Sequence, residues 1–249
     1  MAGTPPDARL RLVSVLTAAV GREIDLHDPL APVAWPDLPT VRAMVLHVGN
    51  VHRWVTAIVR TRDAVEEASV ATTPEGTLRG WYEDGREALL ETLGSSDPDE
   101  PCWVLGTVPP VVGFWRRRMI YENAKHLMDL RAAGGAPWTP AAELSAADYA
   151  DGIDELLSVF LPRSRSGLRP LPAPVVLHAT DVGRRWRIGR DWDVSEAPDD
   201  DRAARISAAA SDLALALWER ADLRDRGRFP VRGDTAAADA LASTQIHPW

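Results

Sequence analysis

The feature that most constrains this chain is the regular spacing of apolar residues between Thr40 and Arg60. These residues are Val41, Met44, Val45, Val48, Val51, Val55, Ile58 and Val59. They recur about every 3.6 residues, so the segment is predicted to be a helix with one buried face. Thr40 is suited to cap its first turn. A long helix with a single apolar face needs other helices to cover that face, which favours a helical bundle.

Helical signals also mark the rest of the first two-thirds of the chain. The other predicted helices span residues 4–20, 83–93, 113–133 and 145–160. Thr4 has the spacing of a capping box at the start of the first helix, and Gly21 is predicted to end that helix. Residues 61–80 are predicted to be a loop, with a short extended piece around residues 68–72. Since no convincing strand separates the helices, residues 1–162 are predicted to form a helical bundle domain.

The sequence changes in character after residue 162. Residues 163–174 combine proline, glycine and arginine without any period, which is typical of a linker. Beyond the linker, strand patterns at residues 175–181, 185–188 and 192–195 are followed by helix patterns at residues 209–220 and 235–241. Residues 175–249 are therefore predicted to form a small α+β domain. The fold class expected for the whole chain is a two-domain protein, α followed by α/β.

Composition excludes several classes of function. The formal net charge is −8 and the isoelectric point is near 5.3, which disfavours both a nucleic-acid partner and an anionic membrane surface. No apolar run reaches the roughly 18 residues of a membrane span, and the first residues have no signal-peptide pattern. Cys102 is the only cysteine, so no intrachain disulfide is possible. One lysine against 27 arginines indicates a G+C-rich bacterial genome. We expect a cytoplasmic protein in which Cys102 is a buried structural thiol.

The predicted helix at residues 113–133 carries ionisable residues on its apolar stripe. At about 100° per residue, one line along this helix contains Trp115, Met119, Glu122, His126, Asp129 and Ala133. Glu122 and His126 are four residues apart and therefore adjacent on that line. Burying such groups is costly unless they are paired or bind a metal. A buried Glu122–His126 ion pair, with Asp129 bonded locally, is the alternative that the spacing leaves open.

The helix at residues 40–60 offers a further imidazole. His47 and His52 both lie on the inward half of its apolar face. Either one would complete a set of two histidines and one glutamate, a ligand set known for zinc with an open fourth position. Periodicity does not choose between the two histidines.

Several segments resemble the mycothiol-dependent maleylpyruvate isomerase family, which belongs to the DinB-like group of metal-binding four-helix bundles. Residues 46–54 (LHVGNVHRW) resemble the family's second-helix motif, and residues 115–129 (WRRRMIYENAKHLMD) resemble its Glu-x-x-x-His-x-x-Asp motif. Trp35 resembles the tryptophan that precedes the second helix, although residues 36–39 depart from the pattern. In the C-terminal half, residues 177–186, 210–220 and 232–234 resemble the family's sterol-carrier-like second domain.

The resemblance implies a metal site and a thiol cofactor. Carried over residue by residue, the metal ligands would be His47, Glu122 and His126, with His52 near the pocket. The metal would be Zn²⁺, with Ni²⁺ as an alternative, and the thiol would be mycothiol or a similar small thiol. In the enzyme that gives the family its name, the thiol adds reversibly to a cis-enedione acid, and the trans isomer forms on elimination. Such chemistry needs no cysteine of the protein.

Three residues are candidates for catalytic roles. Arg118 lies nearest the inner face among Arg116, Arg117 and Arg118, so it could receive a carboxylate, although a solvated basic patch is the competing interpretation. Asp129 would either orient His126 or bind polar atoms in the core. His52 is the third candidate.

The functional hypothesis leans towards an enzyme, a metal-dependent isomerase or S-transferase that uses a low-molecular-weight thiol on a small activated carboxylic acid. One alternative is a non-catalytic metal-containing protein that binds a small molecule. Another is a metal-assisted hydrolase in which Asp129 or His52 is the general base. Residues 60–110 contain no motif that identifies the substrate, and the sequence does not give the oligomeric state.

Overall fold

The computed structural model describes residues 6–35, 37–196, 203–244 and 246, and it divides into two compact units, Met1–Glu143 and Leu144–Trp249. The second unit begins earlier than the boundary at residue 162 expected from the sequence. The reason is that the helix α6 (Ala146–Glu155) packs against a helix of the C-terminal unit, α8 (Ala210–Leu217). The predicted cap at Thr4, together with Pro36 and His247, lies outside the described residues.

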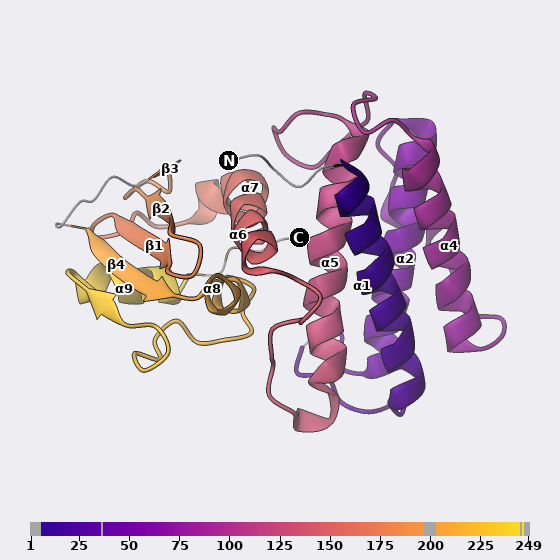
Figure 1. Cartoon of the computed structure of the whole chain (residues 1–249), viewed down its shortest axis with the longest axis horizontal. Coiled ribbons are helices and arrows are strands. Elements are labelled where there is room, and N and C mark those ends of the chain that lie inside the picture. Colours follow the sequence, from indigo (N-terminus) through magenta and orange to yellow (C-terminus); the bar gives the residue numbers. More distant parts are fainter. Residues whose placement is uncertain (1–5, 36, 197–202, 245, 247–249) are drawn as a thin grey trace. The chain divides into compact units, whose positions relative to one another are not determined.

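Four long helices form the first unit (Figure 1), and they are α1 (Pro6–Leu26), α2 (Val41–Thr61), α4 (Leu78–Ser95) and α5 (Val112–Arg131). Helix α1 packs against α4 and α5, and α2 packs against the same two helices. The helices therefore surround the core in the order α1, α5, α2, α4. This arrangement confirms the four-helix bundle, and it places α2 and α5 side by side.

Helix α2 forms as its apolar spacing predicts. The Thr40 hydroxyl accepts a hydrogen bond from the Ala43 backbone N–H at 3.2 Å, which satisfies one free donor of the first turn. The apolar face is buried along its whole length, from Val41 through Val48 to Ile58. The helix ends at Thr61, and the next residue, Arg62, caps it with a φ of 66° in the left-handed region.

Three local predictions in this unit were wrong. Helix α1 does not end at Gly21 but continues to Leu26. A Cβ at Gly21 would lie 2.6 Å from Oε1 of Glu83, so this glycine serves close packing against α4 instead of ending the helix. Residues 67–70 form the short helix α3 (Glu67–Val70) instead of an extended piece. Helix α4 begins at Leu78, not near residue 83, because the Thr77 hydroxyl caps its first turn.

The second unit begins with a run of helical segments. The predicted capping box of α6 is confirmed, since the side chains of Ser145 and Asp148 each bond the other's backbone N–H. Helical backbone then continues past Pro162, where it was expected to stop, through a π-helical turn η2 (Leu156–Phe160), α7 (Leu161–Ser164) and a 3₁₀ turn η3 (Arg165–Gly167). Proline is tolerated there because it occupies the first turn of α7.

A five-stranded sheet completes the second unit, with strands β1 (Val175–Ala179), β2 (Arg184–Ile188), β3 (Val194–Glu196), β4 (Ala204–Ala208) and β5 (Val231–Arg232). The strand order is β3-β2-β1-β4-β5, and only the central pair β1–β4 is parallel. Helices α8 and α9 (Thr235–Ala242) pack against β1. The sequence predicted the first three strands, while β4 and β5 were not predicted. The small α+β fold is confirmed.

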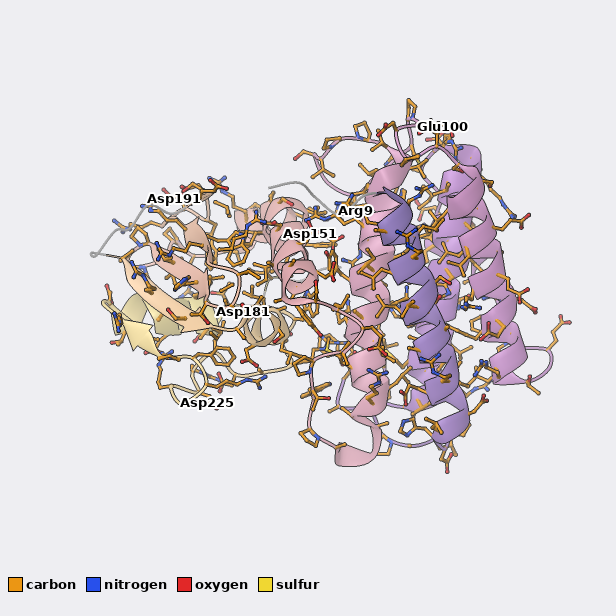
Figure 2. All side chains as sticks on the ribbon, viewed as in Figure 1. Arg9, Glu100, Asp151, Asp181, Asp191 and Asp225 are labelled. Carbon is orange, nitrogen blue, oxygen red and sulfur yellow. The ribbon has the colours of Figure 1, made fainter. Side chains whose placement is uncertain are left out.

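Polar side chains hold this unit together. The Asp181 carboxylate accepts a hydrogen bond from the Ala210 backbone N–H at 2.9 Å, at the beginning of α8 (Figure 2). Asp154 of α6 binds both Arg184 and the indole N–H of Trp186 on β2. Within the described residues, no helix is both long and apolar enough to cross a membrane.

Candidate metal centre

Helix α5 presents a glutamate and a histidine to the interior of the bundle. Glu122 is fully buried and His126 is 2% exposed. Their separation of four residues stacks the two side chains on one face, and Nε2 of His126 lies 3.0 Å from Oε1 of Glu122. This is the adjacency that the sequence predicted.

Helix α2 adds His47 to this pair. Nε2 of His47 lies 3.1 Å from the same Oε1 of Glu122, and the rings of His47 and His126 meet edge to face with centroids 4.9 Å apart. The ligand atoms offered by the three residues all lie within 4.8 Å of one another. Two imidazole nitrogens and one carboxylate oxygen form a donor set that suits zinc and similar divalent ions. The three residues therefore fit a metal ion, and the group is positioned to bind one.

The group is closed on the α5 side and more open on the α2 side. The side chain of Glu122 has no exposure and that of His126 has 3%, whereas the His47 side chain is 24% exposed. His47 is therefore the most exposed of the three candidate ligands.

The Asp129 carboxylate and the Trp138 indole orient His126 from the Nδ1 side of its ring. Oδ2 of Asp129 lies 3.0 Å from Nδ1 of His126, and the indole N–H of Trp138 donates to Oδ1 of Asp129 at 3.0 Å. An imidazole held through Nδ1 directs Nε2 towards a metal, and such partners raise its basicity. Of the two roles left open for Asp129, the contacts favour orienting His126.

Two cationic side chains contact Oε2, the second carboxylate oxygen of Glu122. Nη2 of Arg118 lies 2.6 Å from Oε2 and Nζ of Lys125 lies 3.3 Å from it. Burial alone would raise the pKa of Glu122, but the Lys125 ammonium and His126, together with the hydrogen bonds from His126 and His47, hold this pKa well below its usual range. Glu122 is therefore ionised at neutral pH, as a metal ligand must be.

The surroundings of His126 also favour the protonation state that a metal ligand needs. Burial lowers the pKa of His126, although the Glu122 carboxylate acts in the opposite direction. A neutral imidazole is the form that donates its nitrogen lone pair to a metal.

The structure does not bring His52 into this group. Its Nε2 lies 2.9 Å from Oδ1 of Asn123, and its ring contacts that of Tyr82 with centroids 5.4 Å apart. His52 is fully buried, and burial lowers its pKa to about 4. Where periodicity left His47 and His52 as alternatives, the structure places His47 beside Glu122 and His52 elsewhere in the core.

Two of the three arginines before Glu122, Arg116 and Arg118, are buried and so do not belong to a solvated patch. Arg116 is 3% exposed and donates to the backbone carbonyls of Leu93 and Ser96, at the end of α4. Arg118 is equally buried and donates to Glu122. The contact of Arg118 favours a role in holding Glu122 over one in receiving a substrate carboxylate.

Two residues of the site escaped the sequence analysis. Trp138 belongs to the segment after α5, where no periodic pattern indicates which way a side chain points. The contact of Lys125 with Glu122 could have been predicted, because Lys125 follows Glu122 by three residues on one helix and is the only lysine in the chain.

Cys102 is buried, as the sequence predicted. It is 4% exposed, and its Sγ lies 3.8 Å from the backbone carbonyl of Ile58. Burial raises the pKa of the Cys102 thiol, so the reactive thiolate is disfavoured.

Comparison with known proteins identifies the family. The model of the mycothiol maleylpyruvate isomerase N-terminal domain matches residues 10–131, and the model of the C-terminal domain of the same family matches residues 148–240. The chain belongs to the mycothiol-dependent maleylpyruvate isomerase family. The N-terminal match contains all three residues of the candidate metal centre.

Solved structures agree with this assignment at the level of the fold. The crystal structure of a mycothiol-dependent maleylpyruvate isomerase is similar to this member of the family with a TM-score of 0.63 and 14% identity, over 99% of this chain and 98% of that one. A histidine-to-alanine mutant of a mycothiol-dependent maleylpyruvate isomerase gives a TM-score of 0.61 and 13% identity over the same shares. Among curated proteins, none matches the sequence significantly.

Proposed function

We propose that this protein is a metal-dependent enzyme of the maleylpyruvate isomerase type, with a low-molecular-weight thiol such as mycothiol as its cofactor. Its reaction is cis–trans isomerisation, or S-transfer, on a small activated carboxylic acid. The observation that carries the proposal is the convergence of His47, Glu122 and His126, with their ligand atoms within 4.8 Å of one another. Family membership supports the choice of thiol and of substrate class.

The residues around the centre support a site prepared for a divalent ion, most simply Zn²⁺. A bound divalent ion would supply a Lewis acid that lowers the pKa of an incoming thiol, so that thiolate is available at neutral pH. Glu122 contributes a carboxylate whose pKa is held low by the Lys125 ammonium and by His126, so that it stays ionised. Asp129 holds the Nδ1 side of His126 and leaves Nε2 directed at the centre. Three protein ligands leave room for one more, which is the arrangement of catalytic zinc sites.

The isomerisation consumes no thiol. The thiolate sulfur adds to one carbon of the cis double bond, which becomes a single bond and is free to rotate. The carbon–sulfur bond then breaks, the double bond re-forms in the trans geometry, and the thiol is regenerated. The proton that leaves the thiol in the first step returns in the last, so no oxidant or reductant is required.

The surroundings of the centre argue against metal-assisted hydrolysis. That reaction needs a general base that faces a water molecule at the metal. Asp129 already binds His126 and Trp138, and His52 binds Asn123 away from the group. Both bases suggested by the sequence are thus engaged elsewhere.

An isomerisation assay tests the proposal. The purified protein with Zn²⁺ is mixed with maleylpyruvate, with and without mycothiol, and the trans product is followed by absorbance and chromatography. We expect turnover only when metal and thiol are both present, and none above background for His47→Ala. If neither maleylpyruvate nor related cis-enedioic acids are isomerised with any small thiol, the proposed function is wrong.

A further inference from the structure

The two carboxylate oxygens of Glu122 have different partners. Oε1 faces both imidazoles, at 3.1 Å from Nε2 of His47 and 3.0 Å from Nε2 of His126. Oε2 faces two cations, at 2.6 Å from Nη2 of Arg118 and 3.3 Å from Nζ of Lys125. One oxygen is thus turned to the candidate metal position, and the other is occupied by charge-assisted contacts.

This division matters because a carboxylate can bind a metal through one oxygen or through both. The last torsion of a glutamate side chain has broad, roughly two-fold preferences, so the torsion itself does not decide which oxygen faces the centre. Hydrogen bonds from ionised donors are roughly twice as strong as those between neutral groups. Two such donors on Oε2 would hold that oxygen away from a metal.

A single helix builds this arrangement. Arg118 precedes Glu122 by four residues and Lys125 follows it by three, and these spacings place all three side chains on one face of α5. Arg118 is 3% exposed and Lys125 4%, so water competes little for their contacts. The chain uses arginine for 27 of its 28 basic side chains, and its single lysine is the one beside Glu122. A lysine ammonium is a compact point charge, so Lys125 acts on Oε2 through its positive charge.

We infer that Lys125 is a positioning residue, which acts with Arg118 to fix Glu122 as a one-oxygen metal ligand through Oε1. This inference rests on the proposed metal centre. It assigns Lys125 a role in the coordination number of the metal, not in contact with substrate. Loss of the ammonium would leave Oε2 held by Arg118 alone, so that this oxygen could turn more easily towards the metal, raise the coordination number and change the affinity of the site.

The test compares the metal-binding properties of the full-length wild type and of Lys125→Met, which removes the charge and keeps an unbranched side chain of similar length. Co²⁺ is used as a spectroscopic probe, because four-coordinate Co²⁺ absorbs visible light far more strongly than five- or six-coordinate Co²⁺. Zn²⁺ affinity is measured by chelator competition. We expect the variant to lose most of the intense visible absorption of the wild type, and to bind Zn²⁺ about 10- to 100-fold more weakly.

Two further variants separate positioning from general damage. Lys125→Arg keeps a cation near Oε2 and is expected to keep the intense Co²⁺ spectrum. Arg116→Met removes an equally buried cation of α5 that bonds Leu93 and Ser96 instead of Glu122, so it should leave both readouts unchanged. If Lys125→Met does not fold, Arg118→Met removes the other cation from Oε2 and is judged by the same two readouts.

The possible failures are distinguishable. A wild-type spectrum retained in Lys125→Met, with Zn²⁺ affinity within twofold, would overturn the positioning role and leave the metal centre standing. A wild-type protein that binds neither Co²⁺ nor Zn²⁺ would overturn the metal centre itself, and the role of Lys125 with it.

Discussion

Oδ2 of Asp129 lies 3.0 Å from Nδ1 of His126, on the side of the ring that faces away from Glu122. A carboxylate bonded to Nδ1 leaves Nε2, which faces Oε1 of Glu122, as the ring nitrogen available to a metal. It would hold the proton on Nδ1 when a metal takes the place of the proton on Nε2.

Replacement of this carboxylate should weaken metal binding. In Asp129→Asn the neutral amide loses the charge that holds the His126 tautomer, and Zn²⁺ affinity should fall about 10- to 100-fold. Chelator competition measures the change. Asp84→Asn, an exposed aspartate on α4, is the matched control and should bind Zn²⁺ as the wild type does. Equal affinity in Asp129→Asn and the control would show that Asp129 serves only the packing of the core.

The buried His52 should make the protein less stable in mild acid. Its pKa is about 4 in the folded protein, because burial opposes the charged form, against 6.5 for an unfolded chain. Between these two values the unfolded state binds the additional proton, so the free energy of unfolding falls as the pH falls from 6.5 to 4. The contribution of this one group reaches about 3 kcal/mol at the lower end.

Urea unfolding at several pH values measures this dependence. The His52→Gln variant has no titrating group at this position and should lose that part of the pH dependence between pH 6.5 and 4. Parallel curves for wild type and variant would mean that His52 does not contribute.

A close approach between α2 and α4 gives a test of packing. A Cβ on Gly49 would lie 2.3 Å from Cζ3 of Trp81, so Gly49→Ala forces the Trp81 ring or the helix backbone to shift. We expect the free energy of unfolding to drop by about 1–3 kcal/mol, with a lower melting temperature. Gly94→Ala is the control, since its Cβ would meet only Cδ2 of Leu10 at 3.5 Å, and alanine is the better helix former. A Gly49→Ala protein as stable as the control would contradict the close packing.

The thiol chemistry should not depend on the protein's own cysteine. Cys102 is buried, and its raised pKa keeps it protonated. We therefore expect Cys102→Ala to keep thiol-dependent turnover within about twofold, since a residue without a catalytic role changes activity little. In the native protein, Cys102 should react slowly with a thiol reagent. A folded Cys102→Ala protein without activity would point to a catalytic cysteine.

The sequence predicted those parts of the fold and the site that depend on helical geometry. The apolar spacing along α2 and the four-residue separation of Glu122 and His126 are properties of one helix, so they can be read without knowledge of its neighbours. The strand β4 was missed because Ile206 is its only large apolar residue, and β5 was missed because it has only two residues, so neither shows a readable pattern.

The choice between His47 and His52 could not be made from the sequence in the same way. Both histidines lie on the inward half of α2, and which of them faces Glu122 depends on how α2 and α5 are placed against each other. The contact of Trp138 with Asp129 likewise depends on the path of an irregular segment. The resemblance to a family supplied the choice of His47 that periodicity left open.

Metal analysis of the purified protein tests the central claim most directly. Wild-type protein, His47→Ala and Glu122→Ala are loaded with Zn²⁺, freed of excess metal and assayed for zinc per chain, with circular dichroism as a check of folding. His27→Ala, which removes a histidine outside the group, serves as the control. We predict about one zinc per chain in the wild type and the control and a loss of stoichiometric zinc in both ligand variants, because three protein ligands hold a catalytic zinc. Folded His47→Ala and Glu122→Ala proteins that keep the full zinc content would contradict the assignment.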